Sequence, residues 1–363
     1  MLDALLARKR QDRLLAHAAS VGLDAIVITQ PHHVYYLTAH LPAWRHLAGL
    51  ILRPGGKSLL VTANSIAKDV AADEVISYRA NPGGTLRQDQ AQEIAKLLLD
   101  HLGGVSHIGF DTSETASLLH GSGRTMVCID ETLWQMRRPK DADELKLMTK
   151  AIDATRAMYD RARQIIHPGV PEIDVFNALH AAAVESTGAP MTALLGNDFA
   201  CGVGGGPARA GRKAEAGELY ILDLGPTYRG YFADNARVIS VDRKPTDAQL
   251  KAYEAIVGVF PIVESLAKPG VRCREIYDAV DAHFHATLGK KQVHHLGHGV
   301  GLQAHEFPHL NPNWDDSLVE GEIFTCEPGV YAPDLHGGIR IENQYWVTKT
   351  GVTNLTPFPL AMI

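Results

Sequence analysis

Two apolar runs, each carrying a carboxylate, constrain this chain more than any other feature. Asp223 interrupts the run 220–224, and Asp234 follows eleven residues later, after a turn that contains Pro226 and Gly230. Read as a β-hairpin, this pattern places two strand-borne carboxylates side by side on one face. Because buried like charges repel, such a pair requires either a shared proton or bound metal ions.

Three side chains further along the chain favour metal ions. They are His298 in a Gly-rich segment, Glu327 directly before Pro-Gly, and Glu342 after an apolar residue. With the two Asp residues they offer four carboxylates and one imidazole. Such a set suits Mn, Co, Fe or Zn, and four carboxylates can bridge two ions. A single Asp in an apolar strand can also be hydrogen-bonded or face a turn, so the complete set carries the prediction.

The five residues and their surroundings resemble the pita-bread metallopeptidases, the group of aminopeptidase P, prolidase and creatinase, with methionine aminopeptidase as a more distant relative. In that family two Asp, one His and two Glu, in this order, bind a pair of metal ions. Three accessory residues match as well. His294 lies four residues before His298, His305 lies seven after it, and Arg340 lies two before Glu342.

The resemblance implies a role for each ligand. Asp223 is expected to bind one ion, Asp234 and Glu342 to bridge both, and His298 and Glu327 to complete the second. Water between two ions ~3.5–4 Å apart is hydroxide at neutral pH and attacks a scissile carbonyl. Manganese is the first expectation for the two divalent ions, with cobalt, zinc and iron as alternatives, since cellular supply matters as much as ligand type.

The same resemblance predicts the catalytic side chains. Glu327 is expected to pass on the proton of the nucleophile. His294 and His305 are expected to contact the substrate and to hold the developing oxyanion or the leaving group. Arg340, expected on the strand of the last ligand and on the same face, is expected to pair with a ligand carboxylate or a substrate carboxylate. Glu306 is expected to support the ligands rather than to bind metal.

One position departs from the family. Peptidases of this group that favour Xaa-Pro bonds carry a further active-site His about 17 residues before the first Asp, and here Gly206 occupies that place. Gly206 ends a glycine-rich run that begins at Gly202. The run either allows the backbone to approach a ligand closely or forms a mobile loop. The missing His weakens the expectation of Xaa-Pro specificity and leaves the metal site unchanged.

The leading hypothesis is a dinuclear metal-dependent hydrolase that cleaves N-terminal or dipeptide bonds of small peptides, with Xaa-Pro bonds as the expected target. An alternative is a member of the same family with a non-peptide substrate, such as a creatinase-like amidinohydrolase, an ectoine-type hydrolase or a metal-dependent sulfoniopropionate lyase. A third hypothesis is a non-enzymatic binding module. Pita-bread domains that serve as binders usually lose ligands, so the complete set argues against this third hypothesis.

The length of 363 residues predicts two domains. Strands and helices alternate over roughly the first 130 residues, which predicts an α/β creatinase-like domain over 1–135. Residues 136–363 are expected to form an α+β pita-bread catalytic domain, an antiparallel sheet covered by helices. Between them, Arg137, Arg138 and Lys140 are expected to form a solvated connector.

Composition limits the partners. The net charge of −6 argues against nucleic acid or an anionic membrane. No stretch approaches the ~20 apolar residues of a membrane span, and residues 1–13 lack the apolar centre of a signal peptide. Four scattered cysteines suggest reduced thiols and a cytoplasmic protein.

The family resemblance also implies a homodimer, in which the loop 35–46, with Trp44 and Arg45, closes the pocket of the neighbouring subunit. Ordinary packing between domains is the alternative interpretation of Trp44.

Overall fold

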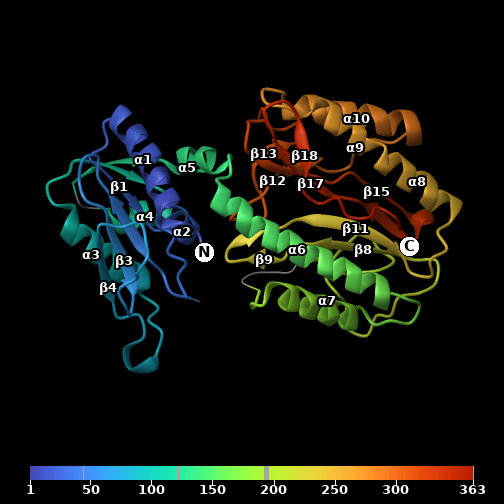
Figure 1. Cartoon of the computed structure of the whole chain (residues 1–363), viewed down its shortest axis with the longest axis horizontal. Helices are drawn as coiled ribbons and strands as arrows, with labels where there is room; N and C mark the ends of the chain where they lie inside the picture. Colours follow the sequence, from blue (N-terminus) through green and yellow to red (C-terminus); the bar gives the residue numbers. More distant parts are fainter. Residues whose placement is uncertain (44, 121–122, 192–195, 363) are drawn as a thin grey trace. The chain divides into compact units, whose positions relative to one another are not determined.

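The computed structural model describes residues 1–43, 45–120, 123–191 and 196–362 (Figure 1). The chain divides into two compact units, Met1–Met136 and Arg137–Ile363. Trp44 lies outside the described residues.

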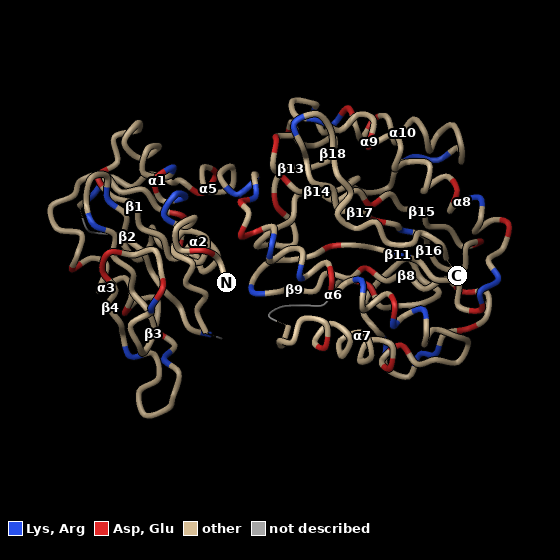
Figure 2. Tube along the Cα trace, viewed as in Figure 1, with Lys and Arg blue, Asp and Glu red and all other residues tan. Residues whose placement is uncertain are grey.

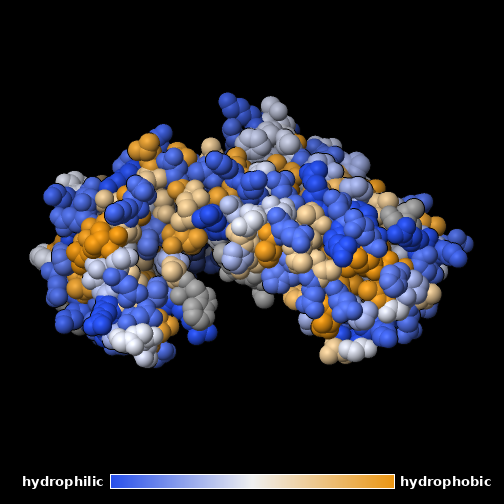
Figure 3. Space-filling model, turned by 60° about the horizontal axis from the view of Figure 1, so that its bottom comes forward, coloured by the Kyte–Doolittle hydropathy of each residue, from blue (hydrophilic) through white to orange (hydrophobic). Residues whose placement is uncertain are grey.

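Lys and Arg are interleaved with Asp and Glu along both units (Figure 2). On the face shown in Figure 3, hydrophobic residues occur in separate groups among hydrophilic ones.

The N-terminal unit is built on a six-stranded mixed sheet with the order β4-β3-β2-β1-β5-β6. Its strands are β1 (Ala25–Ile28), β2 (Gly49–Leu52), β3 (Leu59–Ala63), β4 (Glu74–Tyr78), β5 (His107–Phe110) and β6 (Thr125–Cys128). Its helices are α1 (Ala4–Ser20), α2 (Pro31–Thr38), the short η1 (Pro82–Gly84), α3 (Gln90–Leu102), α4 (Ser113–Leu118) and α5 (Asp130–Arg137). The central strand β1 pairs in parallel with β5 and antiparallel with β2.

Sequence pattern explains this unit. Strand β1 is a short apolar run and is buried along its whole length. Helix α3 places Ile94, Leu98 and Leu102 on one face at intervals of four residues, and this face packs into the same core as the sheet. The Asp111 carboxylate, directly after β5, accepts the backbone N–H groups of Thr29 and Gln30 and so fixes the end of β1.

The C-terminal unit is a set of antiparallel strands between two layers of helices (Figure 1). The strands are β7 (Gly196–Asp198), β8 (Leu219–Leu224), β9 (Thr227–Tyr228), β10 (Tyr231–Phe232), β11 (Asn235–Ser240), β12 (Gly297–Gly299), β13 (Glu306–Leu310), β14 (Ile323–Cys326), β15 (Gly329–Ala332), β16 (Gly337–Arg340), β17 (Asn343–Val347) and β18 (Val352–Asn354). The sheets have the orders β11-β8-β7 and β13-β12-β14-β17-β18, with two ribbons, β9 with β10 and β15 with β16.

The helices of this unit are α6 (Ala142–Ile165), α7 (Glu172–Thr187), α8 (Asp247–Val257), α9 (Val259–Leu266), α10 (Cys273–Leu288) and the short η2 (Pro333–Leu335). A capping box starts α6: the Asp141 side chain accepts the N–H of Glu144, whose side chain accepts the N–H of Asp141. Helices α8 and α9 are consecutive in the chain and are separated only by Gly258.

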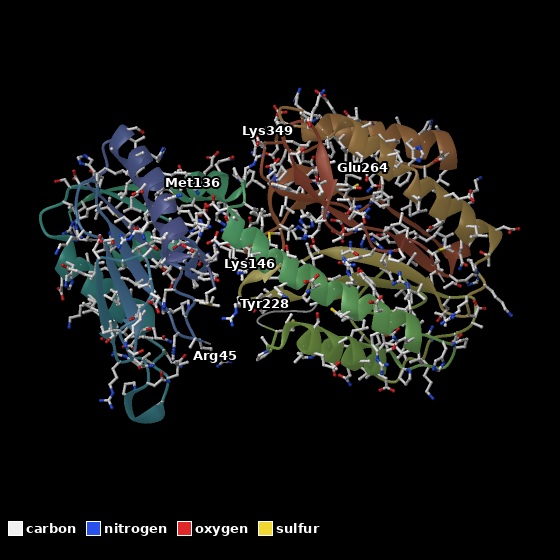
Figure 4. All side chains as sticks on the ribbon, in the orientation of Figure 1. Arg45, Met136, Lys146, Tyr228, Glu264 and Lys349 are labelled. Atoms are coloured by element: carbon white, nitrogen blue, oxygen red, sulfur yellow. The ribbon has the colours of Figure 1, made fainter. Side chains whose placement is uncertain are left out.

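Two hydrophobic cores hold the helix layers on the strands. Helices α6 and α7 share one core with β8, and α8, α9 and α10 share the other with β14 and β17. Glu264 on α9 (Figure 4) accepts a hydrogen bond of 3.0 Å from the Tyr345 hydroxyl on β17, which adds a polar tie between helix and sheet. In the described part of the chain, every helix is too short or too polar to cross a membrane.

The segment that enters α6 differs from its expected form. The expectation that Arg137, Arg138 and Lys140 form a solvated connector is wrong, because all three side chains are buried. Arg138 Nε donates to Glu322 at 2.8 Å, and Arg137 and Lys140 both pair with Glu306. Buried cations require such partners. The carboxylates lie far along the chain, so the local sequence contained no sign of them.

Candidate metal centre

Asp223 and Asp234 lie where β8 and β11 meet. Asp223 is in β8, opposite Ala236 of β11, and Asp234 directly precedes β11. The two strands are antiparallel, as the hairpin reading expects, and the β9–β10 ribbon lies between them in the chain. Each of the two residues is only 6% exposed. Both acids are therefore largely shielded from solvent.

His298 is presented by a strand that approaches its neighbour very closely. A Cβ atom on Gly299 would overlap the carbonyl group of Phe307 in β13, so only glycine fits there. The His298 Nδ1 donates to the Gly299 carbonyl at 2.9 Å, because a carbonyl only accepts. This leaves Nε2, which lies 3.1 Å from the Glu327 carboxylate and 3.7 Å from that of Asp234, as the atom available to a metal.

The two Glu residues complete the set. Glu327 directly follows β14, and Glu342 lies between β16 and β17, where its N–H donates to the Ala236 carbonyl at 2.9 Å. Two groups of three side chains offer ligand atoms within 4.8 Å of one another: Asp234, His298 and Glu342 form one, and His294, His295 and Glu327 form the other. A third such group, Asp141, Asp143 and Glu144, is accounted for by the capping of α6.

Oxygen atoms in this site lack hydrogen-bond partners within the described residues. Both carboxylate oxygens of Glu342 and the Oδ1 of Asp223 are buried and unpaired. Burial, followed by the charge of Asp223, raises the pKa of Asp234 well above its usual range. Burial, followed by the charge of Asp234, does the same to the pKa of Glu342. Uncompensated buried carboxylates are costly, and divalent ions would remove that cost. The donor set therefore fits a pair of divalent metal ions.

Glu327 behaves differently from the other acids because it faces His298. Burial alone would raise the pKa of Glu327, but the hydrogen bond and charge of His298 lower it to about 2. Burial opposes protonation of His298, yet Glu327 outweighs it and raises the pKa of His298. Glu327 is consequently an ionised carboxylate at neutral pH, as a metal ligand must be.

The accessory residues expected from the sequence line the same cavity. Its volume is about 230 Å³, and His294, His305 and Arg340 lie in its wall beside the ligands. The rings of His298 and His305 are stacked, with centroids 3.7 Å apart. His295 also lines the cavity, with its Nδ1 3.6 Å from Glu327. The weaker candidate Glu306 instead has its carboxylate on the Arg137 and Lys140 cations.

Tyr331 connects two of these residues and was not identified from the sequence. His294 Nδ1 donates to the His295 carbonyl at 2.6 Å, so Nε2 accepts from the Tyr331 hydroxyl at 3.1 Å. Arg340 Nη1 donates to the same hydroxyl at 2.9 Å. Tyr331 lies four residues after Glu327, at the half-buried end of the apolar strand β15, and this pattern is equally typical of a structural tyrosine.

Arg340 binds carboxylates of the site itself. Its Nη2 donates to Asp223 at 2.8 Å and to Asp198, which the sequence analysis did not single out. Arg340 thus pairs with the carboxylate of Asp223, a predicted metal ligand. The expectation that Arg340 shares a strand with Glu342 is wrong, because β16 ends at Arg340. The signal for Asp198 was weak: one acid before the apolar residues 199–201.

The sequence profile of metallopeptidase family M24 matches residues 146–349, which is more than half of the chain. The chain belongs to metallopeptidase family M24. The profile of the creatinase/prolidase N-terminal domain matches residues 10–138 of this M24 protein. The expected architecture, a creatinase-like domain followed by a pita-bread domain, is confirmed.

Sequence relatives and solved structures match nearly the whole length of this M24 protein. It is 27% identical over 349 residues to a Xaa-Pro dipeptidase of Pyrococcus horikoshii, covering 92% of this chain and 93% of the relative. It is 29% identical over 364 residues to a putative dipeptidase of Bacillus subtilis, and the match covers 98% of this chain and 99% of the relative. The solved prolidase from Pyrococcus furiosus superposes with a TM-score of 0.79 at 24% identity, and the match covers 95% of this chain and 99% of the prolidase.

Membership of family M24 implies a dinuclear metal site and peptide substrates. The structure brings all five predicted ligands together in one buried region of the C-terminal unit, with oxygen atoms that fit such ions. The chain's own residues therefore agree with what the family implies.

Proposed function

We propose that this M24 protein is a dinuclear metal-dependent peptidase that cleaves N-terminal or dipeptide bonds of small peptides, with Xaa-Pro bonds as the first candidates. Asp223, Asp234, His298, Glu327 and Glu342 would hold two divalent ions, with manganese considered before cobalt, zinc and iron. The observation that carries the proposal is the convergence of these five buried side chains: four of them line one cavity, and the fifth, Glu342, lies within ligand distance of Asp234 and His298 and has unpaired oxygen atoms.

Two bound ions would supply an activated water molecule and an electrophile for the scissile carbonyl. Glu327, ionised beside His298, is placed to accept a proton and to pass it to the leaving amine. His305 and His294 line the cavity, and His305 would donate to the oxyanion or the leaving group. The same role for His294, whose Nε2 accepts from Tyr331, stays a prediction. Substrate contact by Arg340 stays a prediction.

The Xaa-Pro preference is supported by the similarity of this chain to a Xaa-Pro dipeptidase of Pyrococcus horikoshii. Gly206 at the place of the expected His favours the second candidate, a related enzyme with a non-peptide substrate. A cytoplasmic location and a homodimer remain predictions from the sequence.

Turnover by metal-stripped protein tests the proposal. The protein would be reloaded separately with Mn, Co, Zn or Fe and given Xaa-Pro dipeptides, Xaa-Pro tripeptides and matched peptides without proline. Metal-dependent release of the N-terminal residue, abolished in Asp234→Ala, is the expected result. Two bound ions without turnover of any peptide would instead support the non-peptide candidate.

A further inference from the structure

Asp198 is an additional carboxylate in the wall of the metal cavity. It ends β7 and is the direct cross-strand neighbour of Asp223 in β8. Like charges directly opposite each other on neighbouring strands are destabilising. Both side chains are nearly buried, at 12% and 8% exposed, so water screens this repulsion poorly. The pair therefore needs a cation between its members.

Arg340 is that cation. The same atom, Nη2, donates to Asp198 and, at 2.8 Å, to the Oδ2 of Asp223. Only one oxygen of Asp223 is used in this way, and its Oδ1 stays buried without a partner in the described chain. Shared between two acids, Arg340 thus leaves one Asp223 oxygen for a metal ion. Without Asp198, the planar guanidinium would be able to grip both oxygens of Asp223 in a bidentate pair.

The glycine-rich run is shaped around the Asp198 carboxylate. The N–H of Gly206 donates to its Oδ1. At Gly205, where φ is +132°, an added Cβ would lie 2.8 Å from all three atoms of the carboxylate group. A loop with side chains at this point could not close on the acid. Of the two interpretations of the run, close approach of the backbone to another group fits this geometry.

A count of formal charge gives the same result. Asp223, Asp234, Glu327 and Glu342 carry four negative charges, which two divalent ions balance. Asp198 and Arg340 then balance each other. Loss of Asp198 would leave the Arg340 cation uncompensated beside Asp223. Its positive charge would then oppose the binding of the divalent metal ions.

We propose that Asp198 is a positioning residue of the metal centre: it neutralises Arg340 and holds its guanidinium to one oxygen of Asp223, so that the other oxygen stays available to a divalent ion. The inference rests on the proposed two-metal site and is independent of the substrate. It assigns a role to the glycine run and to an acid that lies outside the five ligands.

Mn²⁺ binding tests this role without reference to turnover. Metal-stripped full-length protein would be titrated with Mn²⁺ in a calorimeter, comparing wild type, Asp198→Asn, Arg340→Gln and the double variant. Asp198→Asn keeps an acceptor for Gly206 but loses the charge, and we expect about 10- to 100-fold weaker binding, as for other residues that orient ligands. The double variant, in which the excess cation is also gone, should return to within about threefold of wild type.

Glu172→Gln is the matched control. Glu172 is fully buried, pairs with Arg209 and accepts the N–H of Cys201 beside the same glycine run, but it is not in the cavity wall. The Glu172→Gln substitution should lower thermal stability and leave Mn²⁺ affinity unchanged. Asp198→Ser is a second variant in case Asp198→Asn does not fold.

Wild-type Mn²⁺ affinity in both Asp198 variants would overturn the inference, because Asp198 would then be only a loop residue. A double variant that binds Mn²⁺ as weakly as Asp198→Asn would also overturn it, because Asp198 would then act as a ligand and not through Arg340. A wild type that binds Mn²⁺ but cleaves no peptide would refute the proposed substrate and leave the Asp198 comparison valid. A wild type that binds no Mn²⁺ would overturn both proposals.

Discussion

The imidazole rings of His298 and His305 are stacked face to face, with centroids 3.7 Å apart and planes 9° apart. Burial, followed by the charge of His298, lowers the pKa of His305 to about 4. His305 is therefore neutral at pH 7, and a metal ion on His298 would oppose its protonation further. A neutral imidazole can donate through one nitrogen without adding charge to an already crowded site.

His305→Phe is predicted to lower kcat about 100-fold while the metal content stays at the wild-type level, because a hydrogen-bond donor to the oxyanion or the leaving group is removed but no metal ligand is. His309→Phe is the matched control, since His309 lies on β13, directly after His305, but stacks on Trp314 and pairs with Asp316. Steady-state kinetics and metal analysis of both variants test the prediction. Loss of metal from His305→Phe, or an unchanged kcat, would contradict the assignment.

Glu342→Gln is predicted to stabilise the metal-free protein and to remove its response to metal. Without ions, Glu342 is buried near other acids and its carboxylate has no partner in the described chain, so the amide relieves repulsion. Wild type should gain about 2.7 kcal/mol at a Mn²⁺ concentration 100 times Kd. The measurement is thermal unfolding with and without Mn²⁺.

Glu264→Gln serves as the comparison for that experiment, since Glu264 contacts Tyr345 and not the ligand set. It should keep the full Mn²⁺ response. A Glu342→Gln protein that is still stabilised by Mn²⁺ to the wild-type extent would show that Glu342 is not a ligand.

The candidate ligands could be singled out because their signal in the sequence is local. Each of Asp223, Glu327 and Glu342 sits beside apolar residues, where an acid requires an explanation, and their order along the chain matched a family. The architecture followed from the same resemblance and from the alternation of strands and helices. Element ends were less predictable, as at Gly258, where an apparently continuous helical pattern is divided.

The second layer of the site could not be predicted, because its partners are distant in sequence. Asp198 and Arg340 are 142 residues apart, and neither has a neighbour that indicates the other. The same holds for Arg138 and Glu322, 184 residues apart, where a charged segment read as solvated is buried. The local sequence shows that a residue is charged, but only the folded structure shows which residue neutralises that charge.

Glu306→Gln is predicted to destabilise the C-terminal unit by about 3 kcal/mol, because two buried cations, Arg137 and Lys140, would lose their shared counter-charge. Urea unfolding of the metal-free protein measures this loss. Glu215→Gln is the control: Glu215 also pairs with an arginine, Arg212, but its side chain is 75% exposed, and the change should be under about 1 kcal/mol. Equal effects of the two substitutions would argue against a buried ion cluster.

Glu172 provides a prediction about pH. Burial would raise the pKa of Glu172, but hydrogen bonds from Arg209 and from the backbone of Cys201 lower it from 4.5 to about 2. A carboxyl whose pKa is depressed by folding stabilises the protein above its unfolded pKa, and this contribution disappears as the pH falls through the folded value. The contribution of Glu172 should therefore be complete above about pH 5 and be lost between roughly pH 4.5 and pH 2.

Urea unfolding of metal-free wild type and Glu172→Gln, repeated from pH 7 to pH 2, measures this contribution. At pH 7 the variant should be less stable by about 2 kcal/mol, the usual worth of hydrogen bonds to a buried charge. The difference should shrink as the pH falls below 4.5, because Glu172 of the unfolded wild type then binds a proton that the folded protein binds only near pH 2. A stability difference between wild type and Glu172→Gln that stays constant down to pH 2 would mean that packing, and not the carboxylate charge, makes Glu172 important to the glycine-rich run 202–206.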